Sequence, residues 1–510
     1  MKTLQSLRFL ALACALAAPV AASSADLSWR EKAERDLAAL KVAIEDSHPG
    51  SIDPENPGFR VWLNEGYIKA RQKLAQVETG PGYAAVMRYY VNGFKDVHLQ
   101  VKLSGVGKLR TPGFMVKLDK GGEYVVANRI NLESKVPPIG SKLLSCDGKS
   151  AMMLASENLD PYFTVTQLNA HRWMAAPYLL VDDGNPFVSV PSRCIFQTPE
   201  LGEQPYVLQW SDVSGVAADN AVSGILDWNP NLGVRKLGNR GYWITVPTLL
   251  ASSDNPLFHD LIADIEKNVK AIRTSEVLVI DVRSNAGGYH PWGTAIAYAI
   301  WGESYVKRRA PDAVLDARVS AANASFLGTP EAKKESAAFA KLEGSNRSLG
   351  EELRAAYDAK RPWVTFPIYP TAKPKARLTD SPVKGKVVLL TDSWCTSACL
   401  MFADLLFELG DVMHVGQPTN ADTLYTGVRK QKLESKHASL TLPTEVFRRR
   451  KRGSNQTYVP RHVFRGEMSD TYELERWILK LTQPEPKTKV ASSRDARATT
   501  APSRRPVTGR

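Results

Sequence analysis

The chain has 510 residues, of which 43% are hydrophobic and 23% charged, with a formal net charge of +13. This composition is ordinary for a globular protein, so large cores can be buried, and the length permits two to four domains. Beyond the first residues, no stretch is long and apolar enough to span a bilayer, which excludes a helical integral membrane protein.

The first 25 residues have the pattern of a secretory signal peptide. Lys2 and Arg8 precede an apolar run, and small residues follow it near Ala22 and Ala25, where cleavage is expected. The mature chain is therefore expected to be exported, either periplasmic or secreted.

Four cysteines follow this leader, namely Cys146, Cys194, Cys395 and Cys399. An oxidising compartment permits two disulfides, but the spacing leaves the pairing open, and free buried cysteines are an equal alternative. No group of Cys and His has the spacing of a zinc site, so we expect no metal and no cofactor.

Positive charge is concentrated in two places. Residues 448–452 read RRRKR, and the tail, 483–510, carries seven Lys or Arg against two acids after Gln483. Such basic runs are mostly solvated, and the Pro- and Ser-rich tail is expected to be disordered. In an exported protein the tail favours weak contact with anionic surfaces, and no nucleic-acid partner is expected.

The patterning of the chain changes three times after the leader. Residues 26–104 show the apolar spacing of helices. Residues 105–190 contain short strand patterns with Pro-Gly and Asp-Gly turns, which predict a β-rich domain. Residues 191–482 alternate strands with helices, which predicts an α/β layered core with parallel pairing. Within the core, residues 303–365 are charged and helical and are expected to form an insertion or lid.

A cluster of hydroxyl side chains lies between a predicted buried strand and a predicted helix, in TDSWCTSACLMFADLL, residues 391–406. Helix capping alone explains serines at such a point, and Thr396 and Ser393 are the better cap candidates. Alternatively Ser397 is a nucleophile, because backbone N–H groups and the macrodipole at a helix start stabilise negative charge.

Four segments in this order resemble the tail-specific, or C-terminal-processing, serine peptidases. The resemblance implies a crotonase-like layered core with an N-terminal helical region and an inserted PDZ-like domain, closer to the tricorn-type Ser/His branch than to the Ser/Lys branch. In the turn VGQPTNADTLY, the position of the Ser/Lys branch's lysine holds Ala421, Asp422 and Thr423. The four segments are EDSHPG (45–50), NGFKDVHLQV (92–101), VLVIDVRSNAGG (277–288) and SWCTSACLMFADLL (393–406).

The resemblance assigns roles to residues of these segments. It implies that Ser397 is the nucleophile and that His98 is its general base. The backbone N–H of Ala398 would stabilise the oxyanion, together with that of Gly287 or Gly288, whose missing side chains allow close approach.

The group that orients the histidine stays open. Val97 stands beside His98, and GSNQTYVP (453–460) has no glutamate where relatives carry one, so Asp96 and Asp422 are the available acids. Asp281 and Arg283 are expected to form a structural ion pair rather than to react.

These observations leave two hypotheses of different classes. In the first, the protein is an exported serine peptidase that hydrolyses polypeptides by acyl transfer, with the PDZ-like domain, including TPGFMV (111–116), receiving a polypeptide or a protein C-terminus. In the alternative, it is a catalytically inactive peptide-binding protein on the same scaffold. The missing lysine and glutamate favour the second hypothesis, and the retained serine and histidine favour the first.

Overall fold

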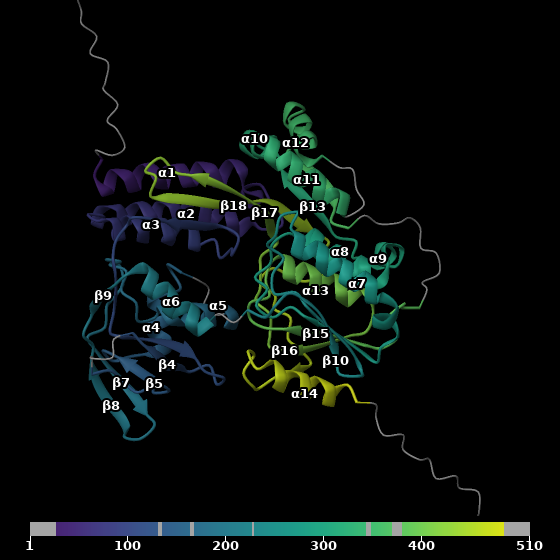
Figure 1. The fold of residues 1–510 in the computed structure, drawn as a ribbon. Helices are drawn as coiled ribbons and strands as arrows, with labels where there is room; N and C mark the ends of the chain where they lie inside the picture. Colours follow the sequence, from purple (N-terminus) through teal and green to yellow (C-terminus); the bar gives the residue numbers. More distant parts are fainter. Residues whose placement is uncertain are drawn as a thin grey trace, which may run out of the picture.

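The computed structural model describes residues 27–130, 135–163, 168–226, 229–342, 348–369 and 380–483. The leader and nearly all of the basic tail lie outside these ranges, so the expectations for them stay predictions. Within the ranges, no helix is long and apolar enough to cross a membrane. Figure 1 shows a central sheet flanked by helices, a β-rich unit beside it, and a helical layer over a further sheet.

The N-terminal region is helical, as its pattern predicts. Apolar residues of its first helix recur at helical spacing, including Leu37, Leu40 and Ile44, and all three are buried against Leu440 and Leu442 of a long strand. Figure 1 shows the helices layered over that strand. The elements are α1 (Trp29–Ser47), α2 (Pro57–Lys73), α3 (Gly80–Asn92), β1 (Gln100–Leu103), β17 (Tyr425–Lys432) and β18 (Ala438–Arg448).

The β-rich unit is an antiparallel sheet in the order β3-β4-β5-β7-β8, with β6 paired to β5. A disulfide between Cys146 and Cys194 joins β5 to β7, and the sheet continues past the expected boundary at residue 190. The elements are β2 (Leu109–Thr111), β3 (Phe114–Leu118), β4 (Tyr124–Arg129), β5 (Lys142–Cys146), β6 (Lys149–Ser150), α4 (Ala151–Asn158), α5 (Asn169–Ala175), β7 (Arg193–Thr198), β8 (Gly202–Val207), β9 (Ser211–Val213) and α6 (Gly215–Leu226).

The central sheet has the order β10-β11-β12-β15-β16-β19, and all its pairs except β10–β11 are parallel. This confirms the α/β class and the parallel pairing. The strands are near-continuous apolar runs because both faces are covered: Leu278 and Ile280 point toward α7, α8 and α13, while Val277 and Val279 point toward α14. The elements are β10 (Gly233–Leu237), β11 (Gly241–Thr245), α7 (Pro256–Thr274), β12 (Val277–Asp281), α8 (His290–Trp301), β15 (Lys386–Thr391), α13 (Ala398–Leu409), β16 (Val412–Gly416), β19 (His462–Val463) and α14 (Thr471–Leu481).

The segment expected to be a helical insertion, 303–365, is only partly helical. It also contributes two strands, which extend the β18 sheet in the order β1-β18-β13-β14. The sequence pattern did not reveal β13 because it buries only the alternate residues Leu315 and Ala317, on either side of the charged Asp316. The elements are α9 (Glu303–Arg309), β13 (Val314–Arg318), α10 (Ala321–Leu327), α11 (Pro330–Leu342), α12 (Leu349–Asp358) and β14 (Trp363–Pro367).

Candidate active site

Ser397 occupies a tight turn between the buried strand β15 and the helix α13. Its backbone has φ 55° and ψ −123°, a conformation that residues other than glycine rarely adopt and that costs about 1–3 kcal/mol. Its side chain makes no capping hydrogen bond to the helix. Instead its Oγ lies 2.9 Å from Nε2 of His98, which is 299 residues away in the chain. The turn therefore directs the hydroxyl toward the histidine.

The expectation that Thr396 and Ser393 cap α13 is wrong. Thr396 Oγ1 is buried and has no hydrogen-bond partner in the described part of the chain. Ser393 Oγ donates to the carbonyl of Pro418 at 3.5 Å, away from the helix. None of these hydroxyls caps the helix. The N–H of Cys399 donates to Thr396 O at 3.1 Å, whereas that of Ala398 has no partner among the described residues.

The Gly-Gly turn after β12 packs directly against the serine turn. A Cβ added to Gly287 would stand 2.8 Å from Ser397 Cβ and 3.1 Å from Ala398 N, and both glycines have positive φ, 94° and 136°. The N–H of Gly287 donates to Asn285 Oδ1 at 2.9 Å. The missing side chain of Gly287 therefore lets the Gly-Gly turn pack closely against the serine turn. The N–H of Gly288, by contrast, has no hydrogen-bond partner among the described residues.

Asp96 holds the loop that carries His98. Its Oδ1 accepts the backbone N–H of His98 at 3.0 Å and the hydroxyl of Thr423 at 2.9 Å, and its Oδ2 lies 3.4 Å from Nε2 of His48. Burial lowers the pKa of His48, against the opposing effect of Asp96. His48 Nδ1 accepts the N–H of Gly50, so its Nε2 carries a proton and donates to Asp96.

The ring of His98 is ready to accept a proton on the side of the serine. To accept the hydrogen of Ser397 Oγ, Nε2 must be unprotonated, which places the ring proton on Nδ1. Nδ1 is buried and lacks a hydrogen-bond partner among the described residues, and Oδ1 of Asp96 lies 3.9 Å from it. Asp96 is thus close enough to stabilise a charged ring, although it does not hydrogen-bond to Nδ1.

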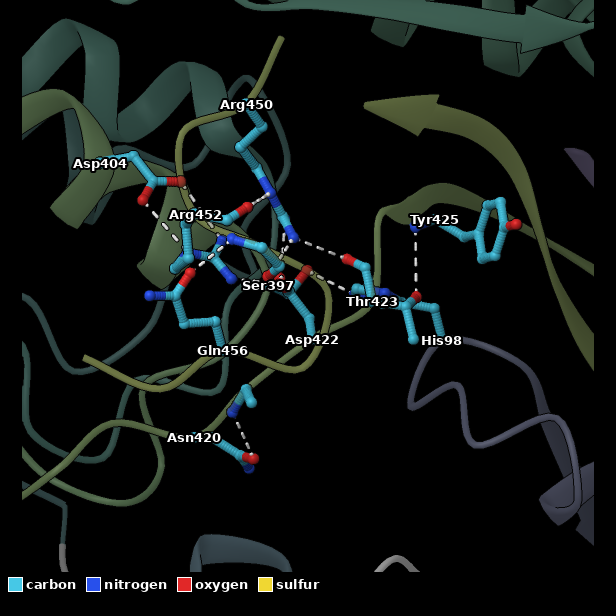
Figure 2. Close-up of polar contacts among 12 residues, drawn as sticks. His98, Ser397, Asp404, Asn420, Asp422, Thr423, Tyr425, Arg450, Arg452 and Gln456 are labelled. Atoms are coloured by element: carbon cyan, nitrogen blue, oxygen red, sulfur yellow. Dashed lines mark hydrogen bonds and ion pairs between the residues drawn. The ribbon is translucent and has the colours of Figure 1, made fainter. Parts of the chain in front are cut away.

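Asp422, the other acid considered for orienting the histidine, is engaged elsewhere. Figure 2 shows its carboxylate between two arginines. Its Oδ1 accepts from Arg450 at 3.0 Å and from Arg452 at 2.5 Å, and Arg452 also bonds to Asp404. Burial alone raises the pKa of Asp422, but Arg452 and Arg450 outweigh it, and the pKa lies below the usual range. Asp422 acts on His98 only through its charge.

This arrangement also corrects the interpretation of RRRKR as a solvated run. The side chains of Arg450 and Arg452 are 3% and 0% exposed, and Arg448 forms ion pairs with Asp53 and Asp316. Alternate arginines of the run point inward to buried carboxylates that lie far away in the sequence, which a charge count cannot reveal.

A second carboxylate, that of Asp392, joins the two turns. Its Oδ2 accepts the N–H of Ser284 at 2.8 Å and its Oδ1 accepts the N–H of Trp394 at 3.0 Å. Burial raises its pKa to about 6. Next to it, Asp281 and Arg283 form a bidentate pair with both side chains fully buried, the structural ion pair that the sequence predicts.

The Ser397–His98 pair opens onto a cleft of about 1180 Å³, large enough for a polypeptide segment. One wall contains His171 of α5, which is 4% exposed and has no hydrogen-bond partner for either ring nitrogen among the described residues. Burial lowers its pKa, opposed by the nearby polar groups of Asn420 and Ala421. Other lining residues are Lys95, Tyr162, Met174, Thr396 and Asn420.

Sequence reasoning missed three of these residues. His48 and His171 gave no signal beyond their position, and Asp392 was not singled out at all. Only for Asp392 was a sequence signal present, because it directly follows a buried strand in the same turn as Ser397.

The model of Peptidase family S41 matches residues 244–463, which include the Gly-Gly turn and the serine turn. Among solved structures, mature CPAF is 15% identical, with 89% of this chain and 98% of that chain covered and a TM-score of 0.59. A mutant form of CPAF has the same identity and coverage, with a TM-score of 0.61. No curated protein matches.

The family match makes the chain a serine-type peptidase, a hydrolase of peptide bonds. More particularly, residues 244–463 match the model of Peptidase family S41, which confirms the predicted resemblance to the tail-specific serine peptidases. At 15% identity, the likeness to CPAF supports a shared fold over most of both chains.

Proposed function

We propose that the protein hydrolyses polypeptides with Ser397 as the nucleophile and His98 as the general base. The observation that carries this proposal is the distance of 2.9 Å between Ser397 Oγ and His98 Nε2 at the wall of a cleft. Two groups from distant parts of the chain meet at the separation that proton transfer requires. Neither residue has another hydrogen bond from these atoms within the described residues, so the pairing is available for chemistry.

The reaction follows from this pairing. Nε2 of His98 takes the proton of Ser397 Oγ as the oxygen attacks the substrate carbonyl carbon, and the carbonyl oxygen becomes an oxyanion. The leaving amine then takes the proton from Nε2, and an acyl-serine remains. Water, deprotonated by the same nitrogen, releases the acyl group and restores the serine.

We assign the oxyanion hole to two backbone N–H groups that have no hydrogen-bond partner among the described residues. Ala398 at the start of α13 supplies the first, and we assign the second to Gly288 rather than Gly287, because the N–H of Gly287 is bonded to Asn285. Each such donor typically stabilises the transition state by about 3–4 kcal/mol.

Asp96 is the acid we assign to His98. It fixes the histidine backbone and lies 3.9 Å from Nδ1, where its charge stabilises the imidazolium that forms during attack. Asp422 contributes a weaker field, since two arginines balance its charge.

We assign peptide recognition to the β-rich unit and chemistry to a crotonase-like core. Strand β3 lies at an edge of the β-rich sheet, directly after the TPG turn with Gly113 at φ 88°. PDZ-like binding adds a strand of the ligand to such a sheet edge. Two disulfides favour an oxidising compartment and thus support export, periplasmic or secreted.

Hydrolysis of an unfolded polypeptide such as reduced, alkylated casein tests the proposal. Ser397→Ala should abolish cleavage by the purified mature protein, whereas the matched control Ser393→Ala, a serine of the same turn, should retain most of it. Peptide binding should survive in Ser397→Ala. Cleavage that persists in Ser397→Ala would overturn the proposed nucleophile.

A further inference from the structure

The nucleophile lies inside a small covalent ring. Cys395 and Cys399 form a disulfide across four residues of sequence, with their Cα atoms 5.3 Å apart, and Ser397 is the middle residue of the ring. Both cysteines are fully buried in the core, Cys395 in the turn and Cys399 in the first turn of α13. The bridge therefore joins the last part of the turn to the first turn of the helix that presents the oxyanion donor.

Ser397 needs such a restraint, because its backbone conformation is unfavourable in itself. Its φ of 55° is unfavourable for a serine, and its side chain does not cap the helix. Backbone hydrogen bonds anchor the start of the ring outside it: Cys395 N–H donates to the carbonyl of Asp392 at 3.2 Å, and Cys395 O accepts from the N–H of Asn420 at 3.1 Å. Toward the helix, Cys399 N–H donates to Thr396 O at 3.1 Å, within the ring, and Ser397 O accepts from Met401 N–H at 3.0 Å. The other end is tied back to Cys395 by the disulfide.

Reduction of this bridge would act on the geometry of the site. Two thiols cannot stay at bonding distance, so their sulfur atoms must move apart to ordinary contact. The surrounding core is closely packed and cannot absorb this displacement freely. The segment between the two cysteines is the part able to move, and it carries both Ser397 Oγ and the N–H of Ala398. A displacement of about 1 Å at a reacting group typically reduces the rate by about 100-fold.

The second disulfide offers a contrast within the same chain. Cys146 and Cys194 are separated by 48 residues and lie in the β-rich sheet. In the chain-entropy account, a bridge that closes a long loop restricts the unfolded chain more than one that closes a short loop. The long bridge should thus contribute more to overall stability, and the short one more to the chemistry.

We propose that the Cys395–Cys399 disulfide is the positioning element of Ser397, so that the peptidase is competent only when this pair is oxidised. In forming the bond, the two thiols lose two electrons and two protons to a disulfide donor, which is reduced to two thiols. A chain folded in a reducing compartment is then latent, and becomes active on transfer to an oxidising one. This inference rests on the proposed function of Ser397.

The test compares two double variants, Cys395→Ala/Cys399→Ala and the matched control Cys146→Ala/Cys194→Ala. We expect the first to lower kcat for casein-derived peptides and the rate of fluorophosphonate labelling by about 100-fold, with KM within about twofold of wild type. Its melting temperature should fall less than that of the control, whose kcat should stay within about threefold of wild type. A folded Cys395→Ala/Cys399→Ala protein with wild-type kcat would overturn the inference.

A redox titration keeps the test decisive even where the alanine variant fails to fold. In the Cys146→Ala/Cys194→Ala protein, Cys395–Cys399 is the one disulfide left among the described residues. Glutathione buffers set its oxidation, which thiol alkylation and mass spectrometry measure. The kcat should rise and fall reversibly with the oxidised fraction. Full kcat in folded, reduced protein would contradict the inference while leaving the proposed nucleophile intact. An oxidised wild-type protein that neither cleaves nor labels would refute the proposed function, and this inference with it.

Discussion

Ser397 reaches the site from the end of a buried parallel strand, whereas His98 reaches it from a loop between a helix and an edge strand. The serine side is fixed by apolar packing, by close contact with Gly287 and by a covalent ring. The histidine side is fixed by a carboxylate, Asp96, that gathers several hydrogen bonds. Changes of packing should therefore damage the serine side, and changes of charge should damage the histidine side.

The largest effect is expected from a change of shape on the serine side. In Gly287→Ala the new Cβ would stand 2.8 Å from Ser397 Cβ, so the serine turn must shift. We expect kcat to fall by about 1000-fold, comparable to the loss of an oxyanion donor. Gly302→Ala is the control, since Gly302 has a similar φ of 87° and its added Cβ meets only Arg273, at 3.6 Å. Equal losses of kcat in both variants would show that backbone strain alone is responsible.

On the histidine side, changing Asp96 or Asp422 to its amide should affect different quantities, kcat in the first case and stability in the second. Asp96→Asn removes the charge beside His98 and should lower kcat by about 10- to 100-fold, in a protein that still folds. Asp422→Asn leaves Arg450 and Arg452 buried without their carboxylate, and should lower the free energy of unfolding by about 3 kcal/mol with a smaller change in kcat. Urea unfolding and casein assays on both variants measure the difference. The reverse pattern would make Asp422 the orienting acid.

A smaller effect, on stability, is expected at Asp392, which joins the Gly-Gly turn to the serine turn. Burial raises the pKa of Asp392 to about 6, so its contribution to stability is complete below about pH 4 and is lost as the pH rises through about 6. Asp392→Asn cannot titrate. The free energy of unfolding should therefore fall less between pH 4 and 7 in this variant than in wild type, by about 2–3 kcal/mol. Asp411→Asn, at an exposed position, is the control and should keep the wild-type slope.

The smallest effect is expected at the wall of the cleft. His171 is buried, its ring nitrogens have no hydrogen-bond partners among the described residues, and it belongs to the β-rich unit rather than to the core. His171→Ala should raise KM a few-fold and leave kcat nearly unchanged, because it removes a contact made equally before and during the reaction. His259→Ala, on an exposed part of α7, should change neither. A fall in kcat alone would place His171 among the reacting groups.

The sequence is informative where structure is encoded locally. The parallel core could be predicted because apolar runs such as VLVID and KVVLL alternate with amphipathic helices. Ser397 and His98 could be selected because each lies in a short segment whose order along the chain resembles one family. The strands β13 and β14 were missed, because β13 buries only Leu315 and Ala317 and β14 buries only Val364, within a charged segment.

What could not be predicted depends on contacts between distant segments. The partners of Arg450 and Arg452 lie about thirty to fifty residues away, and no pattern within RRRKR indicates that these side chains point inward. Disulfide pairing and the burial of His171 likewise follow from how separate units pack. Periodicity reports the face that a residue occupies, but it does not report which residue that face meets.

The most direct test is the rate at which a fluorophosphonate modifies the mature protein, with the adduct located by peptide mass spectrometry. The adduct should be found on Ser397, and His98→Ala should slow its formation by at least about 100-fold, since the base must remove the hydroxyl proton. A rate that stays within twofold of wild type in folded His98→Ala, or an adduct on a different serine, would contradict the pairing on which the account depends.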